Sequence, residues 1–93
     1  MCYEDLAAMD LVIPDFVLDK HGLTREQVEH AWRNAVQYTR TDMPDGRFVI
    51  AAMGQDGEGR WAEITAISKP YGLLVFHANT PLSNRALREF GLR

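Results

Sequence analysis

His77 is the residue of this sequence with the clearest potential for chemistry. It follows the apolar residues 73–76 and precedes a polar segment, so we expect its imidazole to be partly exposed. Histidine side chains titrate near neutral pH and serve as general acids and bases. The alternative is a half-buried strand histidine that hydrogen-bonds a helix cap, and the sequence alone leaves both interpretations open.

Three arginines are the candidate cations for a site around His77. Arg47 opens one expected strand, Arg60 opens the next, and Arg85 lies in the last expected helix. Cleavage of RNA by its own 2′-hydroxyl needs a general base, a general acid and cations that stabilise the charged phosphorane. His77 could supply either proton role. The candidate catalytic residues are therefore His77, Arg85, Arg47 and Arg60.

Four further polar residues are candidates for contacts with a substrate: Lys20, His21, Asn79 and Arg88. Lys20 and His21 end a short expected helix and could form an edge that faces phosphate. The alternative for His21 is a cation that complements the negative end of the helix dipole. For Asn79 the sequence favours a helix cap over a substrate ligand.

A metal site is not expected. His21, His30 and His77 lack the spacing of metal ligands, such as two histidines one helical turn apart. Cys2 is the single cysteine, which excludes an internal disulfide and a multi-cysteine metal site. The glycines of residues 54–59 lie between two expected strands, which indicates a hairpin loop and not a phosphate-binding loop. We expect no cofactor.

The strongest helical pattern in the chain follows Gly22. Thr24 and Gln27 have the spacing of a capping box, and Leu23 and Val28 are placed for a hydrophobic staple. Apolar residues then recur at helical spacing, which predicts a helix over about residues 25–38.

Shorter elements precede this helix. Pro14 suits a first helical turn and Gly22 suits a helix end, which predicts a short helix over about residues 14–21. Residues 11–13 are expected to be an extended lead-in. Residues 1–10 are expected to be loosely ordered, with at most one helical turn.

The second half of the chain predicts strands followed by one helix. Residues 47–53, 60–68 and 73–78 are expected strands; the last is the most apolar and is expected to be central. We expect Trp61 and Phe76 in the core. Asn79 or Thr80 would cap a final helix that ends at Gly91, with an apolar face of Leu82, Ala86, Leu87 and Phe90.

Length and charge restrict the kind of protein. The 93 residues suit one domain, and no apolar run reaches the roughly 18 residues of a membrane span. The acidic N-terminus does not resemble a signal peptide, so we expect a cytoplasmic protein. The net charge is −3, but residues 46–93 carry six Lys or Arg against four Asp or Glu. An RNA partner would therefore have to meet a local patch on the C-terminal half.

The order of these elements resembles the BrnT-type toxins of bacterial toxin–antitoxin pairs, within the wider RelE/ParE-like group. The resemblance covers about residues 14–90. It rests on Lys-His-Gly at residues 20–22, on Arg47-Phe48 opening the first strand, on the Asp-Gly hairpin, and on a polar strand end that enters a basic helix. It implies a RelE-like α+β fold: two N-terminal helices, a three- to four-stranded antiparallel sheet and a C-terminal helix.

The resemblance also implies a function: a toxin that is a metal-independent endoribonuclease, with RNA as substrate and a cognate antitoxin protein as partner. The sequence departs from the family's basic pattern, because Asn79 stands where a cation is expected and the last helix offers only Arg85 and Arg88. The rival hypothesis is a non-catalytic, toxin-like module that binds another protein or a second copy of itself. The acidic N-terminal segment and the net charge of −3 favour this rival.

Overall fold

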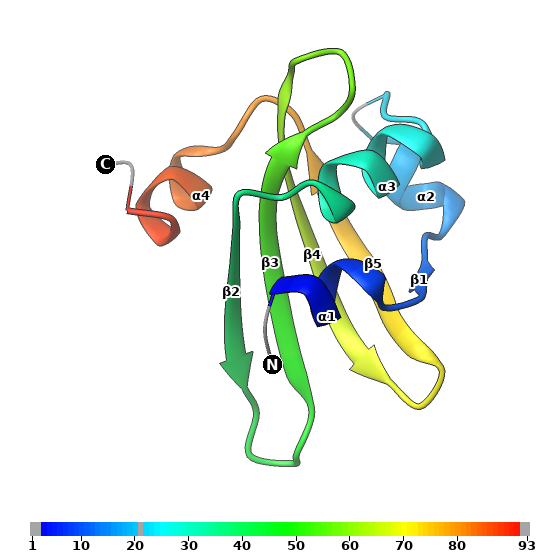
Figure 1. The fold of residues 1–93 in the computed structure, drawn as a ribbon, viewed down its shortest axis with the longest axis vertical. Coiled ribbons are helices and arrows are strands. Elements are labelled where there is room, and N and C mark those ends of the chain that lie inside the picture. Colours follow the sequence, from blue (N-terminus) through cyan, green and yellow to red (C-terminus); the bar gives the residue numbers. More distant parts are fainter. Residues whose placement is uncertain (1–2, 21, 92–93) are drawn as a thin grey trace.

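Four consecutive strands of the chain form an antiparallel meander, and helices precede and follow it (Figure 1). The computed structural model describes residues 3–20 and 22–91. The elements are α1 (Tyr3–Ala8), β1 (Leu11–Val12), α2 (Asp15–Asp19), α3 (Arg25–Arg33), β2 (Gln37–Asp42), β3 (Phe48–Gln55), β4 (Trp61–Lys69), β5 (Gly72–Asn79) and α4 (Asn84–Glu89). The fold class is α+β, as the sequence predicted.

The sheet has five strands in the order β1-β5-β4-β3-β2, and it is mixed. β1 runs parallel to β5, with Leu11 opposite Leu73 and Val12 opposite Leu74. The prediction of a three- to four-stranded antiparallel sheet was therefore wrong at both edges, where β1 and β2 add strands. The apolar β5 lies beside the short β1, and the centre of the sheet is β4. β5 is apolar because β1 covers its edge and α2 packs against it.

The capping box that opens α3 is confirmed. The Gln27 N–H donates to Thr24 Oγ1 at 3.1 Å, and the Thr24 N–H donates to Gln27 Oε1 at 2.8 Å. The predicted end of this helix near residue 38 was wrong, since α3 ends at Arg33 and Asn34 caps it.

Pairing with β3 explains why the helix stops there. The Val36 N–H donates to Met53 O at 2.8 Å, and residues 37–42 pair in register with β3. Tyr38 is buried, and its hydroxyl donates to Trp32 O. Aromatic and β-branched residues such as Tyr38, Thr39 and Thr41 favour a strand, and cross-strand partners outweigh the local helical spacing.

The N-terminal segment is also more regular than expected. Residues 3–8 form α1, where the sequence predicted loose order. Two side chains of α3 hold it: Trp32 Nε1 donates to Leu6 O at 2.8 Å, and Arg33 donates to Ala7 O at 2.6 Å. Leu6 is buried in the main core.

The last helix begins later than predicted. Ser83 caps α4, because its Oγ accepts from the Ala86 N–H at 3.1 Å. Asn79 and Thr80, the predicted caps, lie before the turn that leads to the helix: Asn79 is the last residue of β5, and the Thr80 hydroxyl donates to Trp61 O at 2.7 Å.

The two faces of the sheet are covered differently. On one face α1, α2 and α3 pack over β3, β4 and β5 and enclose the main core, to which Ile50, Ile64 and Val75 contribute (Figure 1). We call this the covered face. The backbone of α3 comes so close to β3 that a Cβ at Gly54 would collide with Ala31 O. Glycine is therefore required at this contact.

Of the helices in residues 3–20 and 22–91, α4 alone lies on the opposite face, which we call the open face. A small cluster of Met53, Ala86 and Phe90 seats α4 at one end of it. Trp61 and Phe76 were predicted to be core residues, but 39% and 46% of their surfaces are exposed. The reason is the pleat of the sheet, which turns both rings away from the covered face. The rest of the open face is accessible.

Candidate functional site

An irregularity in β5 places His77 on the open face. Thr65 of β4 is opposite His77, whereas its neighbour Ala66 is opposite Val75, so Phe76 is an extra residue in β5. Val75 and Ala78 are buried in the main core, and both Phe76 and His77 face the other side. Bulges of this kind redirect side chains and are frequent beside active sites. Strict alternation from Val75 would have turned His77 toward the core.

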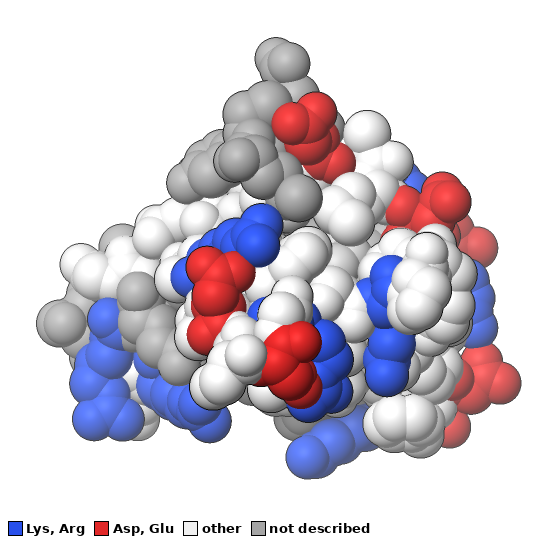
Figure 2. Space-filling model, turned by 90° about the horizontal axis from the view of Figure 1, so that it is seen from below, with Lys and Arg blue, Asp and Glu red and all other residues white. Residues whose placement is uncertain are grey.

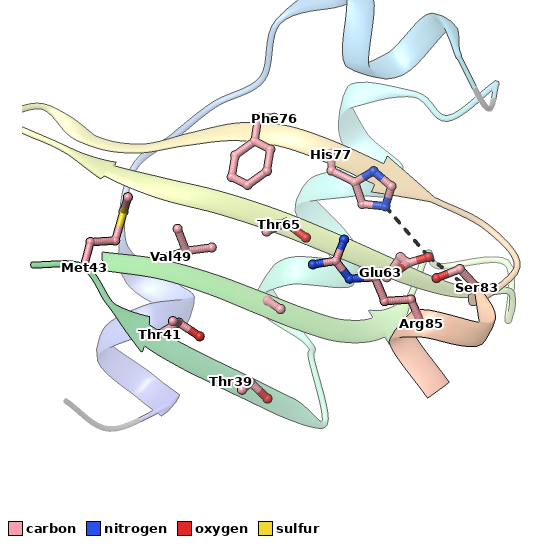
Figure 3. A pocket seen from close by; sticks show the side chains of 11 residues that line it. Thr39, Thr41, Met43, Val49, Glu63, Thr65, Phe76, His77, Ser83 and Arg85 are labelled. Atoms are coloured by element: carbon pink, nitrogen blue, oxygen red, sulfur yellow. Dashed lines mark hydrogen bonds and ion pairs between the residues drawn. The ribbon is translucent and has the colours of Figure 1, made fainter. Parts of the chain in front are cut away.

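A groove of about 730 Å3 runs over the open face next to His77 (Figure 3). Its floor contains one register row across four strands, in which Thr39, Ala51, Thr65 and His77 are successive cross-strand partners. The small side chains in this row leave the floor open. The residues that line the groove are Thr39, Thr41, Met43, Val49, Ala51, Glu63, Thr65, Phe76, His77, Ser83 and Arg85.

Glu63 of β4 is the buried carboxylate of the groove. Its Oε1 accepts from Asn79 Nδ2 at 2.9 Å and from the Ser83 N–H at 3.0 Å, and it lies 3.8 Å from His77 Nε2. Burial acts to raise the pKa of Glu63, but the hydrogen bonds from Asn79 and Ser83 and the charge of His77 together outweigh it and lower that pKa below its ordinary value. Glu63 is therefore a carboxylate at neutral pH and can hold the imidazole in place.

Arg85 reaches the same groove from α4. Figure 3 shows its guanidinium directed over the sheet, toward the side where His77 and Glu63 lie. The helix that carries it is fixed by the Ser83 cap at its start and by Phe90 at its end. The groove thus combines an imidazole, a buried carboxylate and a guanidinium.

Two of the predicted catalytic arginines do not line the groove. Arg47 lies in the turn before β3, with its Nε 2.7 Å from Asp45 Oδ2; hydrogen bonds from its N–H and its guanidinium hold the pKa of Asp45 below the ordinary value. Arg60 lies in the β3–β4 loop, with its Nε 2.7 Å from the buried carboxylate of Asp56. Each arginine pairs with an acid close in sequence, which keeps it out of the groove.

The conformation of the β3–β4 loop around Arg60 is held by the carboxylate of Asp56. Asp56 accepts from the N–H groups of Glu58 and Arg60 as well as from the Arg60 guanidinium. Burial acts to raise the pKa of Asp56, but these hydrogen bonds outweigh it, and the pKa lies below the ordinary value. This carboxylate organises the hairpin loop.

The predicted substrate contacts fall in different places. Lys20 follows α2 and lines a second, smaller notch beside the groove. Asn79 donates to Glu63, so it supports the carboxylate. Arg88 is in the last turn of α4 and is exposed. His21 lies outside the described residues.

Lys and Arg side chains gather toward the lower edge of the molecule in Figure 2, which is the side of the open face. Asp and Glu side chains are spread over the middle, the top and the right of this view. The negative net charge therefore does not extend evenly over the surface.

The sequence did not single out Glu63, and it assigned Phe76 to the core. Glu63 stands between the apolar Ala62 and Ile64, and a carboxylate in an apolar strand could have indicated a special role. Phe76 lies in an apolar run, and its place on the groove side follows from the burial of its neighbour Val75, which the sequence pattern does not show.

No group of three or more His, Cys, Asp or Glu side chains within the described residues could hold a metal ion. Among the helices that the structure describes, none has both the length and the apolar character needed to span a bilayer. Comparisons with protein-family models, with curated proteins and with solved structures found no match to this chain.

Proposed function

We propose that this protein is an endoribonuclease of the toxin–antitoxin type, and that RNA binds in the groove of the open face and is cleaved there without a metal. The observation that carries the proposal is the convergence of His77, Glu63 and Arg85 in one groove. These groups come from β5, β4 and α4, which are separate parts of the sequence. Imidazole, carboxylate and guanidinium together match the needs of phosphodiester cleavage.

His77 would perform the proton transfers. Its imidazole accepts the proton of the 2′-hydroxyl as the 2′-oxygen forms a bond to phosphorus. The bond between phosphorus and the 5′-oxygen then breaks, and this oxygen receives a proton from the imidazolium or from water. The products are a 2′,3′-cyclic phosphate and a 5′-hydroxyl.

Glu63 and Arg85 would assist in different ways. Glu63 Oε1 lies 3.8 Å from His77 Nε2, so its carboxylate can orient the ring and stabilise the positive charge that the ring acquires. Because Asn79 and Ser83 already bind this oxygen, Glu63 is a positioning residue. The Arg85 guanidinium can stabilise the negative charge that develops on the phosphorane oxygens.

The floor of the groove suits a sugar–phosphate backbone. Thr39, Thr41 and Thr65 line it, and threonine hydroxyls are common partners of phosphate and ribose oxygens. Among the described residues that line the groove, Arg85 is the one Lys or Arg, so binding within the groove should depend only modestly on salt concentration, since each neutralised phosphate adds to that dependence.

The test compares two arginines on purified protein with an RNA oligonucleotide. Arg85→Ala should lower the cleavage rate about 100- to 1,000-fold, as expected when a transition-state charge loses its partner. His77→Ala should lower it about 100- to 10,000-fold. Arg47→Ala is the matched control, because Arg47 is an exposed arginine outside the groove, and it should cleave like the wild type. Equal losses in Arg47→Ala and Arg85→Ala would refute the assignment of the groove.

The second candidate function is a non-catalytic module that binds a protein, such as an antitoxin or a second copy of the chain. It is favoured by β2, which is an edge strand of the sheet and has no strand on its outer side within the described residues. Exposed edges of this kind accept a strand from a partner. Hydrogen exchange with a candidate antitoxin from a neighbouring gene would test it. Protection of residues 37–42 in a protein that leaves RNA intact would favour this second function.

A further inference from the structure

A small notch adjoins the groove on the side of α2. It has a volume of about 150 Å3 and is lined by Phe16, Val17, Lys20, Phe76, His77 and Ala78. Phe76 and His77 line both the notch and the groove, so the two hollows meet at the proposed reaction centre. Whatever occupies the notch would lie directly beside a group bound at His77.

Two exposed aromatic rings border this notch. Phe16 is 68% exposed on α2, while the next residue, Val17, is buried in the main core. Phe76 is 46% exposed because it follows the buried Val75 in β5 and so faces away from the main core. Leaving large apolar side chains in water forgoes the stabilisation that burial would give, so a pair of such rings beside one hollow indicates a ligand surface.

The size and the charge of the notch restrict its ligand. Its volume is well below the roughly 300–1,000 Å3 of pockets that hold a whole small molecule, so it suits one planar ring system. Lys20 supplies a cation at the border, which complements the phosphate of a nucleotide whose base occupies the notch. A nucleobase with its phosphate has these properties.

We infer that the notch holds one unpaired base of single-stranded RNA, stacked against Phe16 and Phe76, with Lys20 beside its phosphate. The inference rests on the proposed function, and it adds the substrate class: RNA whose bases are free to leave the stack. A base in a duplex would have to be unpaired first, whereas bases of loops and single strands are available for stacking on aromatic side chains.

The experiment measures binding separately from cleavage. The probe is a single-stranded RNA oligonucleotide with 2′-O-methyl groups, which prevent cleavage, and with one fluorescent 2-aminopurine. The wild type should quench the 2-aminopurine and bind this probe more tightly than the same sequence in a duplex. Phe16→Ala should weaken binding about 5- to 150-fold, the usual loss for one stacked base. Phe16→Tyr should restore it.

Tyr71→Ala is the control for removal of an exposed aromatic ring. Tyr71 is 54% exposed in the β4–β5 turn and lines neither hollow. This variant should bind like the wild type, and Lys20→Ala should bind less tightly with a smaller dependence on salt. Because Phe16 is exposed, Phe16→Ala should fold normally, which its thermal unfolding checks.

The outcomes separate this inference from the proposed function. Equal affinity for single strand and duplex, an unchanged affinity in Phe16→Ala, or the absence of RNA binding would overturn the stacking site. Quenching and loss of affinity in Phe16→Ala, together with no cleavage of ordinary RNA by the wild type, would support the stacking site and refute the ribonuclease.

Discussion

The covered and the open face of the same sheet follow the same two-residue alternation but serve different purposes. On the covered face, Ile50, Ile64 and Val75 are fully buried under the helices. On the open face, the same strands present Ala51, Glu63, Thr65 and His77 to the groove, among others. The burial on the covered face stabilises the fold, which leaves the open face free to hold polar groups. At the bulge in β5 the regular alternation is interrupted, and this puts His77 on the open face.

The largest effect is expected from a change on the covered side. Trp32 is fully buried, and Trp32→Ala should lower the free energy of unfolding by about 3–5 kcal/mol, because it removes a large apolar side chain and its hydrogen bond to Leu6 O. Trp61→Ala on the open side should cost about 1 kcal/mol, since the ring is 39% exposed. Urea unfolding measures both. Similar losses for the two tryptophans would contradict the division between the faces.

The next largest effect is expected on RNA cleavage, and it distinguishes the contribution of the bulge from that of the Phe76 ring. Deletion of Phe76 removes the extra residue of β5. Val75 and Ala78 can then remain in the core, and His77 remains on the open face. Without the local bend of the bulge, the imidazole should shift within the open face and lower RNA cleavage on the order of 100-fold, with the protein still folded. Phe76→Ala keeps the bulge and should retain more activity than the deletion. The reverse order would mean that the bulge does not position His77.

Two helix caps offer a finer comparison. Thr24→Ala at α3 and Ser83→Ala at α4 should each lower the free energy of unfolding by about 1 kcal/mol, because each removes a side-chain acceptor for a helix N–H. Only the change at Ser83 should also reduce RNA cleavage, since α4 carries Arg85 into the groove. Denaturant unfolding combined with a cleavage assay measures both effects. Equal loss of cleavage in the two variants would show that the position of α4 does not matter for RNA cleavage.

The smallest effect is expected for the dependence of stability on pH, which two carboxylates with lowered pKa values control. Asp56 and Glu63 have pKa values below the ordinary 3.8 and 4.5, so their folded states favour the charged form. Their contribution to stability is complete above these ordinary values and is lost as the pH falls through the lowered pKa values. Thermal unfolding between neutral and acid pH should therefore show a fall in stability below about pH 4.5. Glu63→Gln should make this fall less steep. An unchanged slope would show that ionisation of Glu63 does not contribute to stability.

The fold could be predicted from the sequence where local signals decide it. The capping box at Thr24 and Gln27 and the three strands β3, β4 and β5 depend on neighbouring residues, and each was recognised to within a few residues. β2 was not, because residues 34–38 continue a helical spacing and only their pairing with β3 makes them a strand. The two-residue β1 likewise exists only through its pairing with β5.

The residues of the groove, too, could be predicted only where residue type alone identifies them. His77 and Arg85 were selected by residue type, and the structure brings both to one groove. Arg47 and Arg60 were selected in the same way, but Asp45 and Asp56 pair with them elsewhere. Glu63 belongs to the groove because of contacts with residues far along the chain, and no local pattern contains that information.

RNA cleavage in the groove is tested most sharply by the chemistry of the ends that the purified protein produces from an RNA oligonucleotide in EDTA. Mass spectrometry of the products should show 2′,3′-cyclic phosphates and 5′-hydroxyls, and these products should be absent with His77→Ala. Intact RNA, or products with a 3′-hydroxyl and a 5′-phosphate, would contradict cleavage by the 2′-hydroxyl in the groove of the open face.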